Sequence, residues 1–245
     1  MLSTKNLDKS FGSLVVAQNI ELTLPAGVRY ALIGPNGAGK TTLINLITGM
    51  LRPDAGQIFL GADDITSLKP EARVRRGLAR TFQINTLFPQ LTALESVTLA
   101  VLERKGRAAT WWRRLPAYGD EIDEAQGILD SLKLVPTKQT RELAYGQQRL
   151  LEIALALASR PRVLLLDEPA AGVPRDESAA LFAAISGLST DLTILFIEHD
   201  MDVVFRFASR ILVMVGGSIL VEGTPEEIGR DARVRDVYLG KRRNG

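Results

Sequence analysis

The chain of 245 residues contains no cysteine and a single histidine, His199. Without cysteine, disulfide bonds, thiolate chemistry and cysteine-based metal sites are excluded, and a reducing compartment is natural. The sequence also lacks any run near the ~18 uninterrupted apolar residues of a membrane-spanning helix. Its first residues carry no apolar run behind a basic region, as a secretory signal would. We therefore expect a protein that is soluble or that reaches a membrane through a partner.

A strong excess of charge is also absent. The sequence has 30 Lys and Arg against 28 Asp and Glu, a balance that does not call for a nucleic-acid partner. Trp111 and Trp112, followed by two arginines, form a pattern that can stack on bases, but the weak net charge favours a peripheral role on a helical lobe. Hydrophobic residues make up 46%, enough for the core of one large α/β domain or of a domain with an inserted lobe.

Short β-rich runs alternate with helical patterns along much of the chain. Three runs are apolar at nearly every position, as is typical of strands covered on both faces of a parallel sheet. They span residues 28–34, 162–169 and 191–199. Residues 209–223 predict two strands joined at Gly216-Gly217, and Thr224 before Pro225 predicts the start of a helix.

Residues 90–160 differ from the rest of the chain. They show helical periodicity and no convincing strand, with a basic and aromatic connection around Trp111. Alternating strands and helices on both sides of a helical block predict a parallel-sheet core with an inserted α-helical subdomain. The stretch KPEARVRRG, residues 69–77, is interpreted as a solvated basic helix.

The stretch GPNGAGKT, Gly34–Thr41, fits the pattern G-x-x-x-x-G-K-[ST] between an apolar run and a helical pattern, which is the setting that this motif requires. Its glycines let the backbone curl so that N–H groups point at phosphate oxygens, and the helix N-terminus adds partial positive charge. Lys40 can reach the β- and γ-phosphates, and the hydroxyl of Thr41 can bind Mg²⁺. The expected nucleotide-binding residues are Gly34, Pro35, Asn36, Gly37, Ala38, Gly39, Lys40, Thr41 and Thr42.

Two carboxylates close the second apolar run. A carboxylate at the end of a buried strand emerges at the edge of the sheet where ligands of α/β proteins bind. We expect Asp167 to hold Mg²⁺, and Glu168 to polarise the attacking water.

The segment LAYGQQRLLEIALALASRPRVLLLDEP, Leu143 to Pro169, joins these motifs in order. It resembles the ABC-transporter ATPase family, in which a signature of the type Leu-Ser-Gly-Gly-Gln opens a helix leading to an Asp-Glu strand end. The resemblance covers essentially the whole chain. It implies an α/β P-loop NTPase core, at 1–89 and 161–245, with a mixed, mainly parallel sheet and an antiparallel β region near the N-terminus. The helical signature subdomain is inserted at 90–160.

The resemblance also implies roles for three further residues. Phe11 falls where the family places an aromatic side chain against adenine, although it could also be a core aromatic at a strand end. Gln83 matches the glutamine of the loop that joins the core to the helical subdomain, where it would sense Mg²⁺ and the γ-phosphate. His199 matches the switch histidine that contacts the γ-phosphate.

The signature, read here as Leu143-Ala144-Tyr145-Gly146-Gln147, has a mechanistic implication. We expect its helix to start after Gly146, with amide groups forming an anion site that has no phosphate of its own. In the family this site closes on the ATP of a second subunit, so a head-to-tail dimer is required. The residues expected to contact nucleotide there are Ala144, Tyr145, Gly146 and Gln147.

Three positions depart from the family pattern. Ala144 replaces the usual serine, and Tyr145 replaces the first glycine. Pro174 stands where the loop crossing the dimer interface usually has aspartate, and proline offers neither a carboxylate nor an N–H.

The variants LAYGQQ, DEPAAG, IEHDM and VYLG are similar to the ATPase subunits of high-affinity branched-chain amino-acid importers. This similarity implies an ATP- and Mg²⁺-dependent ATPase on the cytoplasmic face of the inner membrane, with no nucleic-acid partner. Its partners would be a second ATPase subunit, membrane permeases and, indirectly, a periplasmic solute-binding protein. Alternatives are ABC ATPases serving urea, amide, aromatic-acid or lipopolysaccharide transport, and a soluble ABC protein acting on ribosomes or DNA.

The lone histidine, His199, closes the apolar run at residues 191–199. A single His after an apolar strand is usually a structural residue. Here its strand should end beside Asp167 and Glu168, which favours a contact with the γ-phosphate, with the second ring nitrogen held by a neighbour.

Overall fold

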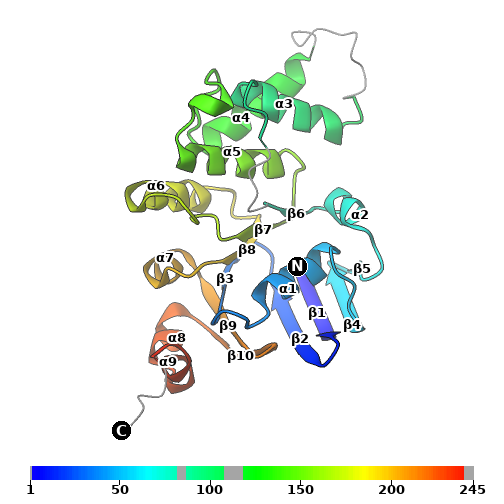
Figure 1. Ribbon diagram of the computed structural model, residues 1–245. Coiled ribbons are helices and arrows are strands. Elements are labelled where there is room, and N and C mark those ends of the chain that lie inside the picture. The colour runs from blue at the N-terminus through cyan, green and yellow to red at the C-terminus, as the bar shows by residue number, and fades with distance from the viewer. Residues whose placement is uncertain (1, 82–86, 108–117, 240–245) are drawn as a thin grey trace.

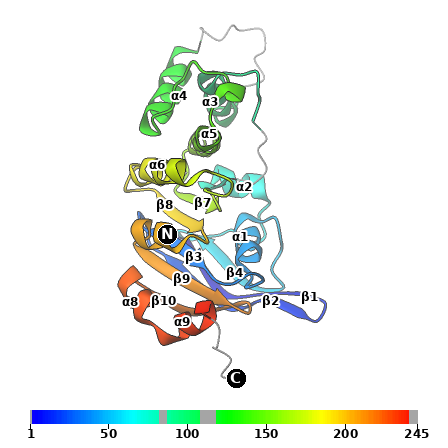
Figure 2. The same ribbon diagram turned by 60° about the vertical axis from the view of Figure 1, so that its left-hand side comes forward.

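The computed structural model describes residues 2–81, 87–107 and 118–239, which form two β-sheets, surrounding helices and a helical lobe at one end (Figures 1 and 2). The larger sheet has the strand order β10-β9-β3-β8-β7-β6. Its strands run parallel except for β10, which pairs antiparallel with β9. The strand bounds are β3 Arg29–Ile33, β6 Leu78–Arg80, β7 Val163–Asp167, β8 Thr193–Ile197, β9 Arg210–Val215 and β10 Ser218–Gly223.

The smaller sheet is antiparallel, with the strand order β2-β1-β4-β5. Its strands are β1 Leu2–Phe11, β2 Leu14–Leu24, β4 Ala55–Leu60 and β5 Asp63–Asp64. The expected fold class, a mainly parallel sheet with an antiparallel region near the N-terminus, is therefore confirmed. The three apolar runs form β3, β7 and β8 as expected. Strands β7 and β8 are buried at every position.

Two hydrophobic cores lie on opposite faces of the larger sheet. Alternation along β3 sends Tyr30 and Leu32 to one core and Ala31 and Ile33 to the other. The first core holds helix α1 (Lys40–Thr48) between the two sheets. The second is covered by α6 (Arg175–Ser186), α7 (Met201–Phe207) and α8 (Pro225–Arg230), after which α9 spans Ala232–Leu239. Thr224 caps α8 as predicted, because its hydroxyl accepts the Glu227 N–H.

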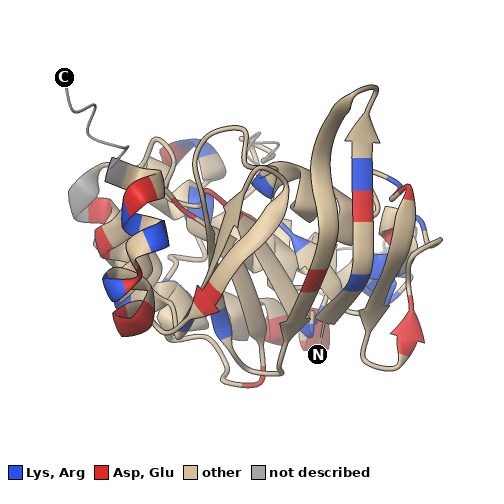
Figure 3. Cartoon of the chain, turned by 90° about the horizontal axis from the view of Figure 1, so that it is seen from below, with Lys and Arg blue, Asp and Glu red and all other residues tan. Residues whose placement is uncertain are grey.

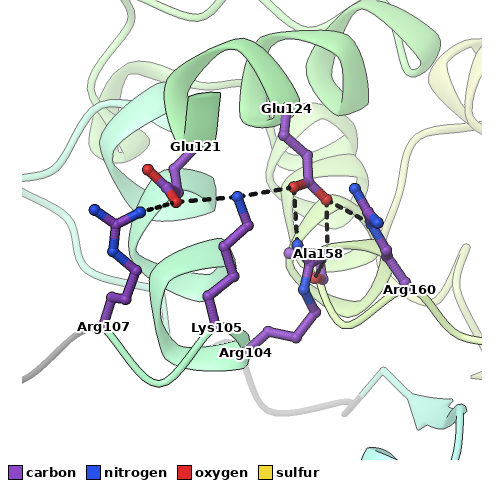
Figure 4. A network of polar contacts seen from close by, with 7 residues as sticks. All are labelled: Arg104, Lys105, Arg107, Glu121, Glu124, Ala158 and Arg160. Carbon is purple, nitrogen blue, oxygen red and sulfur yellow. Dashed lines mark hydrogen bonds and ion pairs between the residues drawn. The ribbon is translucent and has the colours of Figure 1, made fainter. Parts of the chain in front are cut away.

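The helical lobe consists of α3 (Ala93–Arg104), α4 (Gly119–Ser131), the short 3-10 helix η2 (Thr140–Glu142) and α5 (Tyr145–Leu157). Ion pairs join its helices where they meet (Figure 4). Glu124 of α4 accepts hydrogen bonds from Arg104 at 2.6 and 2.8 Å and from Arg160 at 2.8 Å. Arg104 also donates to the carbonyl of Ala158 at the end of α5. One carboxylate thus ties α3 and α4 to the end of the signature helix.

Helix α2 (Pro70–Arg75) corrects one expectation. The stretch is helical, but it is not simply solvated, because Arg73 is 1% exposed. Its guanidinium donates to the carbonyls of Leu46 and Ile47 at 2.7 and 2.6 Å, and to those of Thr66 and Leu68. Arg73 therefore donates to carbonyl groups in the last turn of α1, where the Leu46 carbonyl also accepts the N–H of the C-cap residue Gly49.

Strand β6 was not predicted, because its three residues are too few to show a period. It pairs in parallel with β7 through Leu78, Ala79 and Arg80. This pairing brings Arg80 close to the carboxylates that end β7.

No helix in the described parts of the chain has the length and apolar character needed to cross a membrane. Viewed from below, residues of both charge signs are interspersed over the sheets and the last two helices (Figure 3).

Candidate nucleotide-binding and catalytic site

The candidate site lies at the edge of the larger sheet where β3, β7 and β8 end. Because these strands are parallel and adjacent, the residues that follow them meet at one edge. Gly34 follows β3, Glu168 follows β7, and His199 lies two residues beyond β8. The topology therefore brings the predicted phosphate loop and catalytic residues together.

The phosphate loop requires glycine at its two ends for steric reasons. A Cβ on Gly34 would lie 2.1 Å from the carbonyl oxygen of Met214, and one on Gly39 would lie 2.3 Å from that of Val16. Gly39 also has φ +101°, a conformation that other residues rarely adopt. Gly37 has φ +78° but open space around it. The loop is therefore packed between β2 and β9, with its middle exposed.

Lys40 is the first residue of α1 and is 7% exposed. Its ammonium donates to the carbonyl oxygens of Gly34 and Pro35 at 2.7 and 3.1 Å. Burial lowers the pKa of Lys40, and the carboxylates of Glu168 and Asp167 act in the opposite direction. The cation is therefore held on the loop, facing the two carboxylates.

Asp167 is 4% exposed, and its two oxygens differ. Oδ2 accepts a hydrogen bond from Arg80 at 2.8 Å, whereas Oδ1 is buried and has no hydrogen-bond partner among the described residues. Arg80 also donates to Asn45 of α1 at 2.6 Å. A buried carboxylate oxygen of this kind fits a hydrated Mg²⁺, as does the hydroxyl of the exposed residue Thr41.

Glu168 and His199 are in direct contact. Nε2 of His199 lies 2.7 Å from Oε1 of Glu168, and both side chains are partly exposed. Glu168 has φ +50°, which is uncommon for a residue with a Cβ and is often found at functional sites. The histidine ring was expected to reach a γ-phosphate, but in this structure Nε2 faces the carboxylate.

Glu198 was not identified as a candidate from the sequence. It is 6% exposed, and its carboxylate accepts the N–H groups of Ala170 and His199 at 3.0 and 3.2 Å. Burial raises the pKa of Glu198, and these two N–H groups partly offset that effect. Together with Glu168 and His199 it lines a cavity of about 240 Å³. Its position between an apolar strand and the lone histidine is the signal that could have identified it.

Phe11 ends β1 and is 50% exposed, which excludes the alternative of a core aromatic. The ammonium of Lys9 lies 5.5 Å from the centre of its ring. An exposed aromatic face remains available for a planar ligand.

The signature helix α5 starts at Tyr145, one residue before Gly146, and not after Gly146 as expected. The Tyr145 hydroxyl is hydrogen-bonded to Arg149 at 2.8 Å, and its ring lies against Gly172, where a Cβ would be 3.2 Å from the ring. The N–H of Gly146 donates to Oε2 of Glu177 in α6 at 3.0 Å. The contacts to Gly172 and Glu177 join the signature to the loop before α6 and to the first turn of α6.

The C-terminal helix reaches the phosphate loop. Burial raises the pKa of Tyr238 in α9, and a hydrogen bond from the Gly34 backbone to its hydroxyl partly offsets that effect. Tyr238, which belongs to the VYLG stretch singled out in the sequence, therefore contacts the beginning of the loop. Gln83 and the pair Trp111 and Trp112 lie outside the described residues.

Comparison with known proteins agrees with this geometry. Residues 17–171 match the family model described as "ABC transporter", and residues 218–243 match "Branched-chain amino acid ATP-binding cassette transporter". The chain is 37% identical, over 98% of both chains, to the high-affinity branched-chain amino acid transport ATP-binding protein LivG of Salmonella typhimurium. It is 36% identical, again over 98% of both, to BraF of Pseudomonas aeruginosa, which carries the same description.

Among solved structures, the chain is similar to the ADP conformation of MJ1267, an ATP-binding cassette of an ABC transporter. The TM-score is 0.85 at 31% identity, over 98% of this chain and 99% of that one. The likeness therefore includes the helical lobe and the last helices as well as the sheets.

Proposed function

Since the chain belongs to the ABC transporter family and is an ATPase of its ATP-binding cassette type, we propose that it powers an importer of branched-chain amino acids. The observation that carries the catalytic part is the meeting of Lys40, Asp167, Glu168 and His199 beside the phosphate loop. The observation that carries the transported solute is the similarity to LivG and BraF over nearly the full length.

We assign the following roles to the residues of one chain. The loop amides and Lys40 bind the phosphates of ATP, and Phe11 offers its exposed ring to the adenine. Thr41 and Asp167 hold Mg²⁺, which neutralises charge on the phosphates when bound. Glu168 accepts the proton of the attacking water, and His199 orients the Glu168 carboxylate through their hydrogen bond. Gln83 completes the metal site in this proposal.

The proposal requires a second cassette. The described contacts of the signature turn go to Glu177, Arg149 and Gly172 of the same chain, and none of these belongs to the phosphate loop. The anion site of Ala144–Gln147 therefore serves the ATP held by a partner cassette, in a head-to-tail dimer. Closing and reopening of that dimer would drive membrane permease subunits at the cytoplasmic face, which receive solute from a periplasmic binding protein.

The test starts with a tagged chain purified from membranes of its own host. We expect permease subunits to co-purify, and vesicles holding the complex to take up labelled leucine, isoleucine or valine when MgATP is present with the binding protein. A Lys40→Ala chain is the matched control, since it should assemble but not support uptake.

Other outcomes distinguish the alternatives. Uptake of urea or aromatic acids instead of leucine would reassign the solute and leave the ATPase role in place. Recovery of ribosomes or DNA without any permease would overturn the transport function.

A further inference from the structure

The first turn of the signature helix already holds an anion. The N–H of Gly146 donates to the Glu177 carboxylate at 3.0 Å, across 31 residues of sequence. The approach is close, because a Cβ on Gly146 would lie 2.6 Å from Oε2 of Glu177. Gly146 is buried and Glu177 is half-buried, so this contact is a packed joint between α5 and α6.

The joint takes the place of a missing cap. A serine before a helix usually satisfies an N–H of the first turn with its hydroxyl, but Ala144 at this position has no side-chain acceptor. The carboxylate of Glu177 supplies the acceptor from another helix, and its negative charge is favourable at the positive end of α5.

The three departures from the family pattern meet at this joint. Ala144 leaves the N–H without a cap, and Tyr145 covers Gly172 in the loop that leads to α6. Pro174 begins the turn that positions Glu177, whose N–H donates to the Pro174 carbonyl at 3.0 Å. Sequence changes at separate positions therefore have one structural outcome.

We propose that Glu177 is a displaceable occupant of the signature anion site, and that it sets the ATP concentration at which two cassettes close. This inference rests on the proposed function, in which the same amides face the γ-phosphate held by the partner. One N–H cannot serve a carboxylate and a phosphate together, and the two anions repel each other. The carboxylate has to leave before the phosphate can bind.

Displacement of Glu177 would also affect the surroundings of the catalytic residues. Ser178, the next residue of α6, lines the cavity that contains Glu168, His199 and Val173. Ala170, at the start of the same loop, donates to Glu198 beside His199. A shift of the α6 N-terminus on closure would therefore alter the walls of this cavity.

The first experiment tests the contact. Tyr-Gly bonds occur twice in the sequence, at Tyr118-Gly119 and Tyr145-Gly146. Labelling tyrosine with ¹³C at the carbonyl and glycine with ¹⁵N selects these two amides by NMR. We expect Glu177→Gln to move the Gly146 amide proton upfield and to leave Gly119 unchanged. An unmoved Gly146 signal overturns the proposal.

The second experiment measures closure. In a Glu168→Gln background, which slows hydrolysis, the dimer fraction is followed against ATP concentration by analytical ultracentrifugation. We expect Glu177→Gln and Glu177→Ala to lower the midpoint roughly tenfold, which is the effect of removing one charge at a helix terminus in a partly buried setting. Glu103→Gln, the same charge change on an exposed position of α3, is the control and should leave the midpoint unchanged.

The outcomes separate this inference from the proposed function. A midpoint that stays the same or rises in both Glu177 variants overturns only the role of Glu177. A Glu168→Gln chain that remains monomeric at every ATP concentration overturns the proposed sandwich of two such chains, and the role of Glu177 with it.

Discussion

Nε2 of His199, the single histidine of the chain, lies 2.7 Å from Oε1 of Glu168, the carboxylate that we assign to the attacking water. The contact joins the ends of β7 and β8, and the backbone reinforces it, because the Glu168 N–H donates to the Ile197 carbonyl at 3.1 Å. The two side chains therefore act as a unit, and their substitutions should not be additive.

Glu168→Gln should slow ATP hydrolysis by at least about 100-fold, since the amide cannot accept the proton of water. ATP affinity should change little, because the phosphate loop is untouched. Release of phosphate and binding of a fluorescent ATP analogue measure the two effects. Unchanged turnover would remove Glu168 from the role of base.

His199→Ala should reduce turnover by roughly 10- to 100-fold, because Glu168 loses the partner that orients it. His199→Gln, which keeps an N–H donor, should recover part of this loss, and nucleotide affinity should be nearly the same in both variants. Equal activities of the alanine and glutamine variants would show that the hydrogen bond to Glu168 does not matter.

Gly39→Ala should destabilise the protein by at least about 2 kcal/mol and abolish ATP binding, because the new Cβ meets the Val16 carbonyl and the backbone is left-handed. Gly37→Ala is the matched control. Its φ is also positive but its surroundings are open, so the cost should be about 1 kcal/mol. Urea unfolding with and without ATP distinguishes them, and equal losses would contradict the steric argument.

Arg73→Met should lower the free energy of unfolding by about 3 kcal/mol, since buried carbonyls of α1 lose a charged donor. Arg75→Met on the exposed side of the same helix should change it by less than about 0.5 kcal/mol. Chemical denaturation of both variants provides the comparison. A similar cost for both would mean that helix propensity dominates.

The pH dependence of stability tests the ion-pair network of the lobe. Hydrogen bonds from Arg104 lower the pKa of Glu124 from 4.5 to about 2, against the opposing effect of burial. A carboxyl with a lowered folded-state pKa stabilises the fold above its unfolded pKa, and this contribution is lost as the pH falls toward the folded value. Glu124→Gln should therefore cost about 2 kcal/mol at neutral pH and progressively less between about pH 4.5 and 2.

Urea titrations at several pH values give this difference, with Glu103→Gln as the control for a carboxylate on the exposed face of α3. If the cost of Glu124→Gln is the same at neutral and acidic pH, the network contributes through packing and not through charge.

The phosphate loop and the buried strands could be predicted because their signals are local. Fully apolar runs marked β7 and β8, and the glycine spacing marked the loop between β3 and α1. The order of these motifs then predicts that Asp167, Glu168 and His199 lie at one edge of the sheet.

The remaining contacts could not be predicted because they depend on which charged side chains the tertiary structure buries. Arg73 belongs to a stretch with the pattern of a solvated helix, yet it lies under α1. Glu177 and Glu124 have the sequence pattern of exposed helical residues, and only the folded chain brings Glu177 to Gly146 and Glu124 to Arg104. Strand β6 shows the same limitation, since only pairing with β7 makes it a strand.

The bond between Arg80 and Asp167 has a consequence for the order in which ligands enter. One oxygen of the carboxylate is occupied by a guanidinium, and the described residues contain no cluster of three acidic or histidine side chains that could hold a cation. A single half-neutralised carboxylate binds free Mg²⁺ poorly, because this ion needs several oxygen ligands. If Asp167 holds Mg²⁺ as proposed, we therefore expect the ion to bind together with ATP, so that activity follows the concentration of MgATP rather than that of the free metal.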